Sequence, residues 1–278
     1  MYRDVLVILI LALLPEIVQA CIITMGYRTT SRLPNITAAP HNQGLFVDLY
    51  TEAAQAIKCK LKIIRLPKKR ILKKLQNGEI DFYPGFTFNL ERHKYIHFME
   101  NGLPSLNVGL SRVELQEIHT YYDLKNMRLL LSLGAPRIDA EKYGLIIKQP
   151  PEVSFEGAID YILDNRADFY EGEISAFAYY LKNHKRSKEL KYHFNCCGGL
   201  KPLLLGFSRE SIHFKPKPNP NYDDSIKVTP YNTPTLIDKN SIASQFSNAL
   251  FKLKASGFTD KLFKSYYGID VSELEQIE

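Results

Sequence analysis

Short apolar runs and longer segments with helical spacing alternate along residues 21–278. Short runs rich in apolar residues predict strands at 22–25, 61–66 and 129–133. Apolar positions that recur every three or four residues predict helices at 46–57, 67–78, 136–143, 155–163, 174–181 and 241–267, the last broken at Gly257. Strands that alternate with helices favour parallel sheets covered by helices, so the predicted fold class is α/β.

Two short sequence patterns occur twice, in the same order. Asp-Phe-Tyr at 81–83 recurs at 168–170, and Val-Gly-Leu-Ser-Arg at 108–112 is echoed by Leu-Gly-Phe-Ser-Arg at 205–209. This order predicts two similar α/β lobes, with the second pair of segments as the strands that cross between them. We expect lobe 1 to comprise residues 21–109 plus 207–278 and lobe 2 to comprise residues 110–206. The proline-rich stretch 213–234 predicts an irregular surface excursion.

Residues 1–20 have the pattern of a cleaved export signal. Ten apolar residues at 5–14 are too few to span a bilayer, which needs about 20, and small residues precede Cys21. We therefore predict export with cleavage near Ala20, and a lipid anchor on Cys21 is the less favoured alternative. Cleavage would raise the formal net charge from +6 to about +7. This modest basicity is scattered and offers no organised groove for nucleic acid.

The four cysteines outside the signal can form disulfides in an exported protein. Cys21 opens the first predicted strand and Cys59 the second, so the two thiols lie side by side if these strands are parallel neighbours. A Cys21–Cys59 bridge is one hypothesis, and two buried free thiols are the other. The sequence alone suggests no role for Cys196 and Cys197.

Charged residues elsewhere give weaker indications. The basic group at 68–74 predicts a solvated helix face more readily than a binding patch. No Ser, His and Asp order suggests a catalytic triad, and no His or Cys spacing indicates a metal site. His93 and His97 are four residues apart and would share a face if they lie on one helix. A general acid or base among the histidines, Glu171 and Glu173 remains open.

The loop after the first Asp-Phe-Tyr segment is a candidate anion site. Ligands of open α/β sheets bind beyond the carboxyl ends of the strands. Asn89 is a good helix N-cap, which places Arg92 in the first helical turn. A cation there opposes the helix dipole at a cost of about 0.3–1 kcal/mol unless an anion binds. Arg92, Thr87 and the backbone at Gly85 would therefore suit a carboxylate, and an exposed Arg is the alternative.

The loop after the second Asp-Phe-Tyr segment carries the opposite charge. Glu171 and Glu173 can hold an ammonium group if they face Arg92 across a cleft, and the pair would then suit a zwitterion. Surface positions are the alternative for both residues. Gly134 lies in a turn between a predicted strand and helix, where free amides can cradle an anionic group.

These segments resemble a known family of receptors. Gly-Leu-Phe-Val-Asp-Leu at 44–49, Leu-Gln-Asn-Gly-Glu-Ile-Asp at 75–81, the block 87–92 and Phe98 look like the family 3 periplasmic solute-binding proteins. The resemblance implies a type II periplasmic-binding fold of two lobes, each a mostly parallel sheet flanked by helices, that closes over a ligand. It implies a periplasmic monomer without a cofactor that delivers amino acids to ABC transporter membrane subunits.

The family's ligand contacts can be carried over by position. The resemblance implies that Arg92 binds the α-carboxylate of an amino-acid ligand, with Gly85 and Thr87 as neighbouring contacts. Glu173 matches the residue that takes the α-amino group, and Glu171 is a near alternative. Tyr27 resembles residues that line the side-chain pocket.

Two departures from the family pattern bear on the ligand. Ala135 stands where Thr or Ser is common, and Arg28 stands near the acidic residue typical of receptors for basic amino acids. Because the sequence indicates neither a catalytic triad nor a metal site and the family consists of receptors, we expect this protein to bind its ligand without transforming it. A ligand-sensing subunit and a dehydratase-like enzyme are the alternatives.

Overall fold

The computed structural model describes residues 21–133, 135, 138–182, 184–197, 200–268 and 270–272. The predicted export signal and Gly134 lie outside these residues. The strands are β1 (Cys21–Tyr27), β2 (Cys59–Arg65), β3 (Phe82–Phe86), β4 (Ile96–Arg112), β5 (Arg128–Leu130), β6 (Ile146–Lys148), β7 (Phe169–Glu173), β8 (Leu190–His193), β9 (Leu200–Ser208), β10 (Pro216–Pro218) and β11 (Thr235–Ile237). The helices are α2 (Leu45–Ala56), α3 (Lys68–Gln76), α4 (Leu90–His93), α5 (Ala140–Tyr143), α6 (Phe155–Leu163), α7 (Ile174–Leu181), α8 (Ile242–Ala255) and α9 (Phe258–Tyr267), with 3-10 turns η1 (Tyr121–Leu124) and η2 (Ser187–Glu189).

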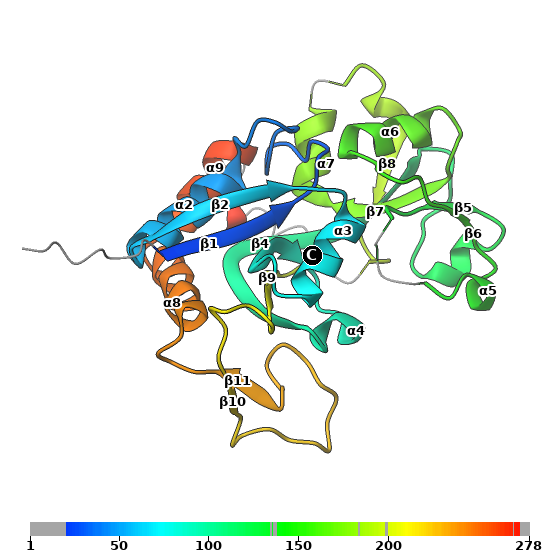
Figure 1. Cartoon of the computed structure of the whole chain (residues 1–278). Helices are drawn as coiled ribbons and strands as arrows, with labels where there is room; N and C mark the ends of the chain where they lie inside the picture. Colours follow the sequence, from blue (N-terminus) through cyan, green and yellow to red (C-terminus); the bar gives the residue numbers. More distant parts are fainter. Residues whose placement is uncertain are drawn as a thin grey trace, which may run out of the picture.

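One long sheet runs through the molecule in the order β2-β1-β3-β9-β4-β7-β5-β6, and β8 also pairs with β4. The outer pairs on each side are parallel, whereas β3, β9, β4, β7 and β8 meet through antiparallel pairs. Figure 1 shows β1 and β2 at one end and β5 and β6 at the other, with helices packed around both ends. This is the α/β architecture that the alternating pattern predicts.

The repeated Asp-Phe-Tyr segments occupy equivalent places in the two ends of the sheet. The Asp81 carboxylate accepts the backbone N–H of Thr24 at 2.6 Å, and the Asp168 carboxylate accepts that of Arg128 at 2.8 Å. In each case the aspartate lies just before its strand and holds a backbone N–H of the parallel neighbour, in the middle of β1 and at the start of β5. The sequence repeat therefore reflects a structural repeat.

The second repeated pattern supplies the antiparallel neighbours of these strands. Phe82 pairs with Phe207 in β9, and Phe169 pairs with Ser111 in β4. Because β4 is 17 residues long and pairs with both β9 and β7, it belongs to both ends of the sheet. The lobe boundaries at 109 and 207 therefore stay predictions.

Most predicted helices keep their bounds, and the exceptions have local causes. The helix predicted at 136–143 begins at Ala140, because the Asp139 side chain accepts the N–H of Lys142 and caps it there. His97 lies in β4 and not on a helix with His93, so the shared helix face is wrong. Gly257 separates α8 from α9 with a φ of +74°, as its position in the pattern predicts.

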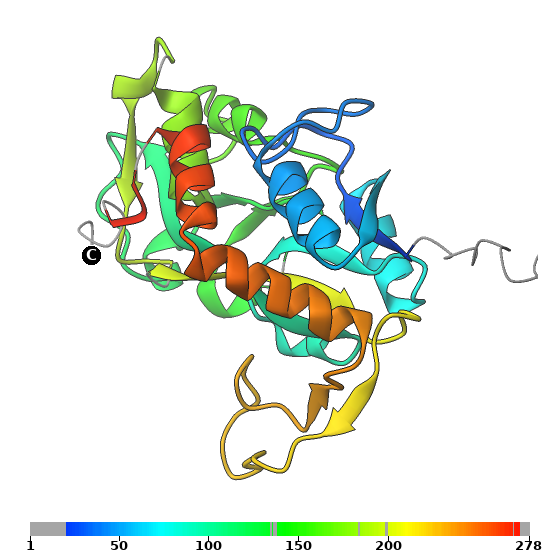
Figure 2. The same cartoon turned by 90° about the vertical axis from the view of Figure 1, so that its left-hand side faces the viewer.

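The proline-rich stretch after β9 leaves the body of the protein. It forms an extended excursion fastened at its base by the antiparallel pair β10–β11, which Figures 1 and 2 show projecting from the sheet. Figure 2 also shows α8 running along the body above this excursion. Across the described residues, no helix combines the length and the apolar character needed to cross a membrane.

All four cysteines are paired. Cys21 and Cys59 start the parallel strands β1 and β2 as register partners, and a disulfide joins them. The hypothesis of this bridge is confirmed and the free-thiol alternative is wrong. The Cys21 sulfur is therefore not available for a lipid thioether. Cys196 and Cys197 are bonded to each other, a pairing that the sequence did not suggest.

Candidate functional site

A cavity of about 250 Å³ lies at the carboxyl ends of β1, β3, β5 and β7. Six candidate residues from the sequence line this cavity: Tyr27, Gly85, Thr87, Arg92, Glu171 and Glu173. Gly134 is outside the described residues, and its neighbours Ser132 and Ala135 line the cavity. The candidate cation and the candidate acids therefore meet in one solvent-accessible gap, because the ends of these strands converge.

Arg92 is held in place by its short helix. The Asn89 side chain caps α4 by accepting the N–H of Arg92 at 3.0 Å, as the sequence predicts. The Arg92 side chain is only 7% exposed and lies over the Phe86 ring, 4.9 Å from its centre. Burial lowers the pKa of Arg92, and the charge of Arg28 adds to this effect. The alternative of an exposed Arg is thus wrong.

Glu171 and Glu173 lie at the end of β7 and reach the cavity from the other side of the sheet centre. Glu173 caps α7, and its carboxylate accepts the N–H of Ala176 at 3.1 Å. Glu171 accepts a hydrogen bond of 2.6 Å from the Tyr121 hydroxyl. Burial raises the pKa of Glu171, although that hydrogen bond and the charge of Lys201 oppose the rise. Both residues are half-buried, so neither is a plain surface position.

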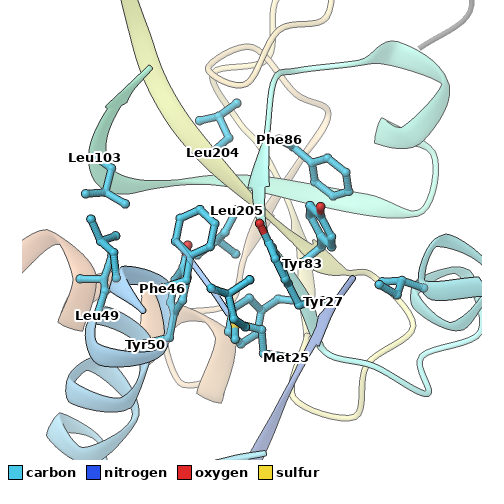
Figure 3. Close-up of a cluster of buried hydrophobic side chains, with 14 of the residues drawn as sticks. Met25, Tyr27, Phe46, Leu49, Tyr50, Tyr83, Phe86, Leu103, Leu204 and Leu205 are labelled. Atoms are coloured by element: carbon cyan, nitrogen blue, oxygen red, sulfur yellow. The ribbon is translucent and has the colours of Figure 1, made fainter. Parts of the chain in front are cut away.

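Aromatic rings form an apolar wall of the cavity. Tyr27 stacks on Tyr83 with ring centres 5.4 Å apart, and Phe46 meets the edge of Tyr27 at 5.7 Å. Figure 3 shows these rings gathered with Phe86 above β1. A Cβ on Gly85 would lie 3.3 Å from the Phe46 ring, so glycine lets the backbone approach this wall closely. Burial raises the pKa of Tyr27, which keeps its hydroxyl neutral.

Three further cations line the cavity. The family resemblance already connects Arg28 with the ligand, whereas Arg32 and Lys68 were not expected there. Arg28 and Arg32 are buried, with 6% and 5% of their surface exposed, and Lys68 is half-buried. The prediction of a solvated face for the basic group of α3 is therefore wrong for Lys68. Burial, together with the charges of Arg28, Arg92 and Arg32, lowers the pKa of Lys68 well below its usual value.

A sequence signal for Lys68 existed. Lys68 is the first residue of α3 and follows β2, so it opposes a helix dipole at a strand's carboxyl end, as Arg92 does. Arg28 directly follows the end of β1. Cations placed just beyond the carboxyl ends of strands are therefore a local sequence signal for this cavity.

Arg32 ties the loop after β1 to the opposite wall. Its guanidinium donates to the Val153 carbonyl at 2.6 Å and lies 4.6 Å from the centre of the Phe155 ring. Thr30 donates to Glu152 at 2.8 Å in the same region. This loop therefore spans the cavity between the two ends of the sheet.

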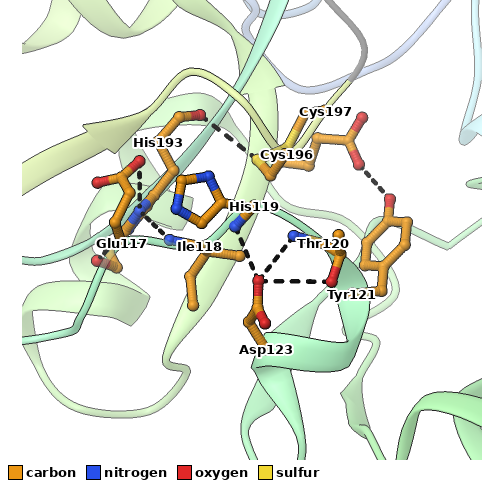
Figure 4. Close-up of a disulfide and its surroundings, with 11 residues drawn as sticks. Glu117, Ile118, His119, Thr120, Tyr121, Asp123, His193, Cys196 and Cys197 are labelled. Carbon is orange, nitrogen blue, oxygen red and sulfur yellow. Dashed lines mark hydrogen bonds and ion pairs between the residues drawn. A yellow bond between two sulfur atoms is a disulfide. The ribbon is translucent and has the colours of Figure 1, made fainter.

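The Cys196–Cys197 disulfide lies near the acidic wall. Both cysteines pack against a small cluster that contains Leu124, Leu129 and Phe169, and Tyr121 packs against the same cluster. Figure 4 shows Tyr121 in the surroundings of this disulfide. Tyr121, which donates to Glu171, therefore shares this cluster with the disulfide. Within the described part of the chain, no cluster of three His, Cys, Asp or Glu side chains is arranged to hold a metal ion.

Comparison with known proteins gives a clear result. The model of a family described as bacterial extracellular solute-binding proteins, family 3, matches residues 23–269. A search of curated protein sequences finds no significant match.

Solved structures with similar folds share little sequence with this chain. An ancestral arginine-binding protein bound to arginine is 17% identical to this chain, with a TM-score of 0.64. The match covers 88% of this chain and 98% of the ancestral protein. The GluR0 ligand-binding core with L-glutamate is 14% identical, with 90% and 99% covered and a TM-score of 0.64. A Streptococcus mutans structure described for glutathione import through GshT and the cystine importer TcyBC is 15% identical, with 90% and 96% covered and a TM-score of 0.68. These similarities concern the fold alone.

Proposed function

Because this chain belongs to family 3 of the bacterial extracellular solute-binding proteins, we propose that it captures an amino acid in the cavity described above. The observation that carries this proposal is the meeting of Arg92 with Glu171 and Glu173 in one gap. A guanidinium on one wall and carboxylates on the other match the two opposite charges of a zwitterion. In this proposal the protein binds its ligand without transforming it.

Each wall of the cavity has a part in this proposal. Arg92 takes the α-carboxylate through two parallel charge-assisted hydrogen bonds, with Thr87 and the Gly85 backbone beside it. Glu173 takes the α-ammonium group, and Glu171 is the near alternative. Tyr27 forms part of the side-chain pocket. The two ends of the sheet close on the ligand like a hinge, which presents a new surface to a partner.

The partner in this proposal is the membrane part of an ABC importer. The family description and the pattern of residues 1–20 support export with cleavage near Ala20. In this proposal the protein acts as a monomer. The type II fold also serves the relatives whose descriptions name arginine, L-glutamate and glutathione import. A small polar ligand is what these descriptions have in common.

Isothermal titration calorimetry of residues 21–278 with a panel of amino acids tests the proposal. For the amino acid that binds, Arg92→Ala should weaken affinity by at least about 2 kcal/mol, roughly 30-fold in Kd, since a buried charge-assisted contact is lost. Lys94→Ala is the matched control, because Lys94 is an exposed cation two residues further along. Unchanged affinity in the Arg92 variant would refute the site assignment.

The alternative of an enzyme on this fold has its own readout. Incubation with prephenate-like and amino-acid substrates, followed by chromatography of the products, should return the added compounds unchanged. Turnover that depends on Glu171 or Glu173 would replace the binding function with a dehydratase-like one.

A further inference from the structure

The cavity holds more positive charge than a neutral zwitterion needs. Arg92 and one glutamate suffice for the α-carboxylate and the α-ammonium group. Resting on the proposed function, we propose that the ligand is an amino acid with an acidic side chain, whose second carboxylate binds among Arg28, Arg32 and Lys68. Such a ligand has two carboxylates and one ammonium group.

Arg28 and Arg32 converge on a single atom of the cavity wall. The two guanidinium groups approach the Ser132 hydroxyl oxygen at 3.4 and 3.3 Å, so two buried cations lie on one small oxygen. Like charges this close repel each other when they are removed from water. An anion placed between them would relieve that repulsion, which the neutral Ser132 hydroxyl cannot do.

Arg32 also has one hydrogen-bond donor without an acceptor among the described residues. Its terminal nitrogens reach Val153, Tyr170 and Ser132, whereas Nε finds no hydrogen-bond partner among the described residues although it is buried. A buried donor without a partner is costly, and guanidinium groups match carboxylates through paired N–H bonds. Arg32 lines the cavity, so its guanidinium group lies beside the proposed ligand.

With every group ionised, the side chains around the cavity carry an excess of positive charge. Four cations line it, Arg28, Arg32, Lys68 and Arg92, against the two carboxylates of Glu171 and Glu173. A further acid, Glu152, lies 3.9 Å from Arg28. Counting that carboxylate leaves one positive charge, and an acidic amino acid brings one net negative charge. A basic side chain would instead add a cation to this group.

Lys68 provides a second signature of the same ligand. Burial, and then the charges of the neighbouring cations, hold the pKa of Lys68 well below its usual value, so its ammonium group loses its proton at a lower pH than that of an exposed lysine. A carboxylate bound beside it would raise that pKa, and the complex would take up protons. Affinity for an acidic ligand should then fall as the pH rises between the pKa of the free protein and that of the complex.

Titration calorimetry with L-glutamate, L-aspartate and their amides tests the inference. Glutamate or aspartate should bind at least about tenfold more tightly than its amide, because the amide has the same shape without the charge. An amide or L-arginine that binds as tightly as the acid would overturn this inference and leave the proposed function standing. Absence of binding by every amino acid would overturn the proposed function as well.

Variants separate the side-chain contact from the rest of the site. Arg28→Met should lower the affinity for the acidic ligand at least about tenfold and that for its amide by less than about threefold, whereas a misfolded variant would lose both. Titrations in buffers of different ionisation heat should show proton uptake with the wild-type protein but not with Lys68→Met. Lys69→Met, an exposed neighbour on the same helix, should behave as wild type. Equal losses for acid and amide, or proton uptake that survives in Lys68→Met, would refute the assignment.

Discussion

The Cys21–Cys59 disulfide should contribute much more stability than the Cys196–Cys197 disulfide. The first bridge closes a loop with a sequence separation of 38, and the second has a separation of 1. Cross-linking removes loop-closure entropy from the unfolded chain, and for 38 residues this amounts to about 4 kcal/mol at 25 °C. For adjacent residues the same reasoning gives under about 1 kcal/mol.

Urea unfolding of the double variants Cys21→Ala/Cys59→Ala and Cys196→Ala/Cys197→Ala measures both contributions. The free energy of unfolding should fall by about 3–5 kcal/mol in the first variant and by about 1 kcal/mol or less in the second. Each variant removes two sulfur atoms, so most of the difference between them comes from the loop term. Equal losses in the two variants, or a loss under about 1 kcal/mol in the first, would show that this reasoning is wrong.

Two further predictions concern the structural repeat. Hydrogen bonds from Arg128, joined by one from Arg112, lower the pKa of Asp168 from 3.8 to about 2. Asp168 therefore stabilises the fold above pH 3.8, and this stability is lost as the pH falls towards 2. Asp168→Asn should cost about 2 kcal/mol at neutral pH and almost nothing near pH 2, and an equal cost at both would contradict the charge argument. Gly109→Ala would place a Cβ 2.0 Å from the buried Phe169 ring, so thermal unfolding should show a loss of about 1–3 kcal/mol; an unchanged Tm would contradict that close packing.

Local sequence signals predicted most elements and part of the site. Helix bounds at 155–163 and 174–181 agree with the structure because apolar spacing and caps such as Ser154 are local properties. The repeated Asp-Phe-Tyr segments indicated two similar ends of the sheet. Ligands of such sheets bind beyond the carboxyl ends of the strands, which predicted that Arg92 and Glu173 face each other. The structure has both residues in the lining of one cavity.

Strands with little pattern of their own were harder to predict. β6 and β8 have three and four residues, too few to show a period, and β4 is far longer than the segment recognised in it. The length of β4 follows from its pairing with β9 on one side and with β7 and β8 on the other. Such pairing joins residues distant in the sequence, so no local window contains it.

By itself, the sequence determined most helices, the strands with a clear apolar pattern and the residues at their ends, since backbone propensity, capping and apolar period act over a few residues. Only the tertiary structure decided that Lys68 leaves the solvated face of its helix and that Arg28 and Arg32 share one hydroxyl of Ser132. Whether a charge is buried, and beside which other charges, depends on groups that the fold brings together from positions about a hundred residues apart.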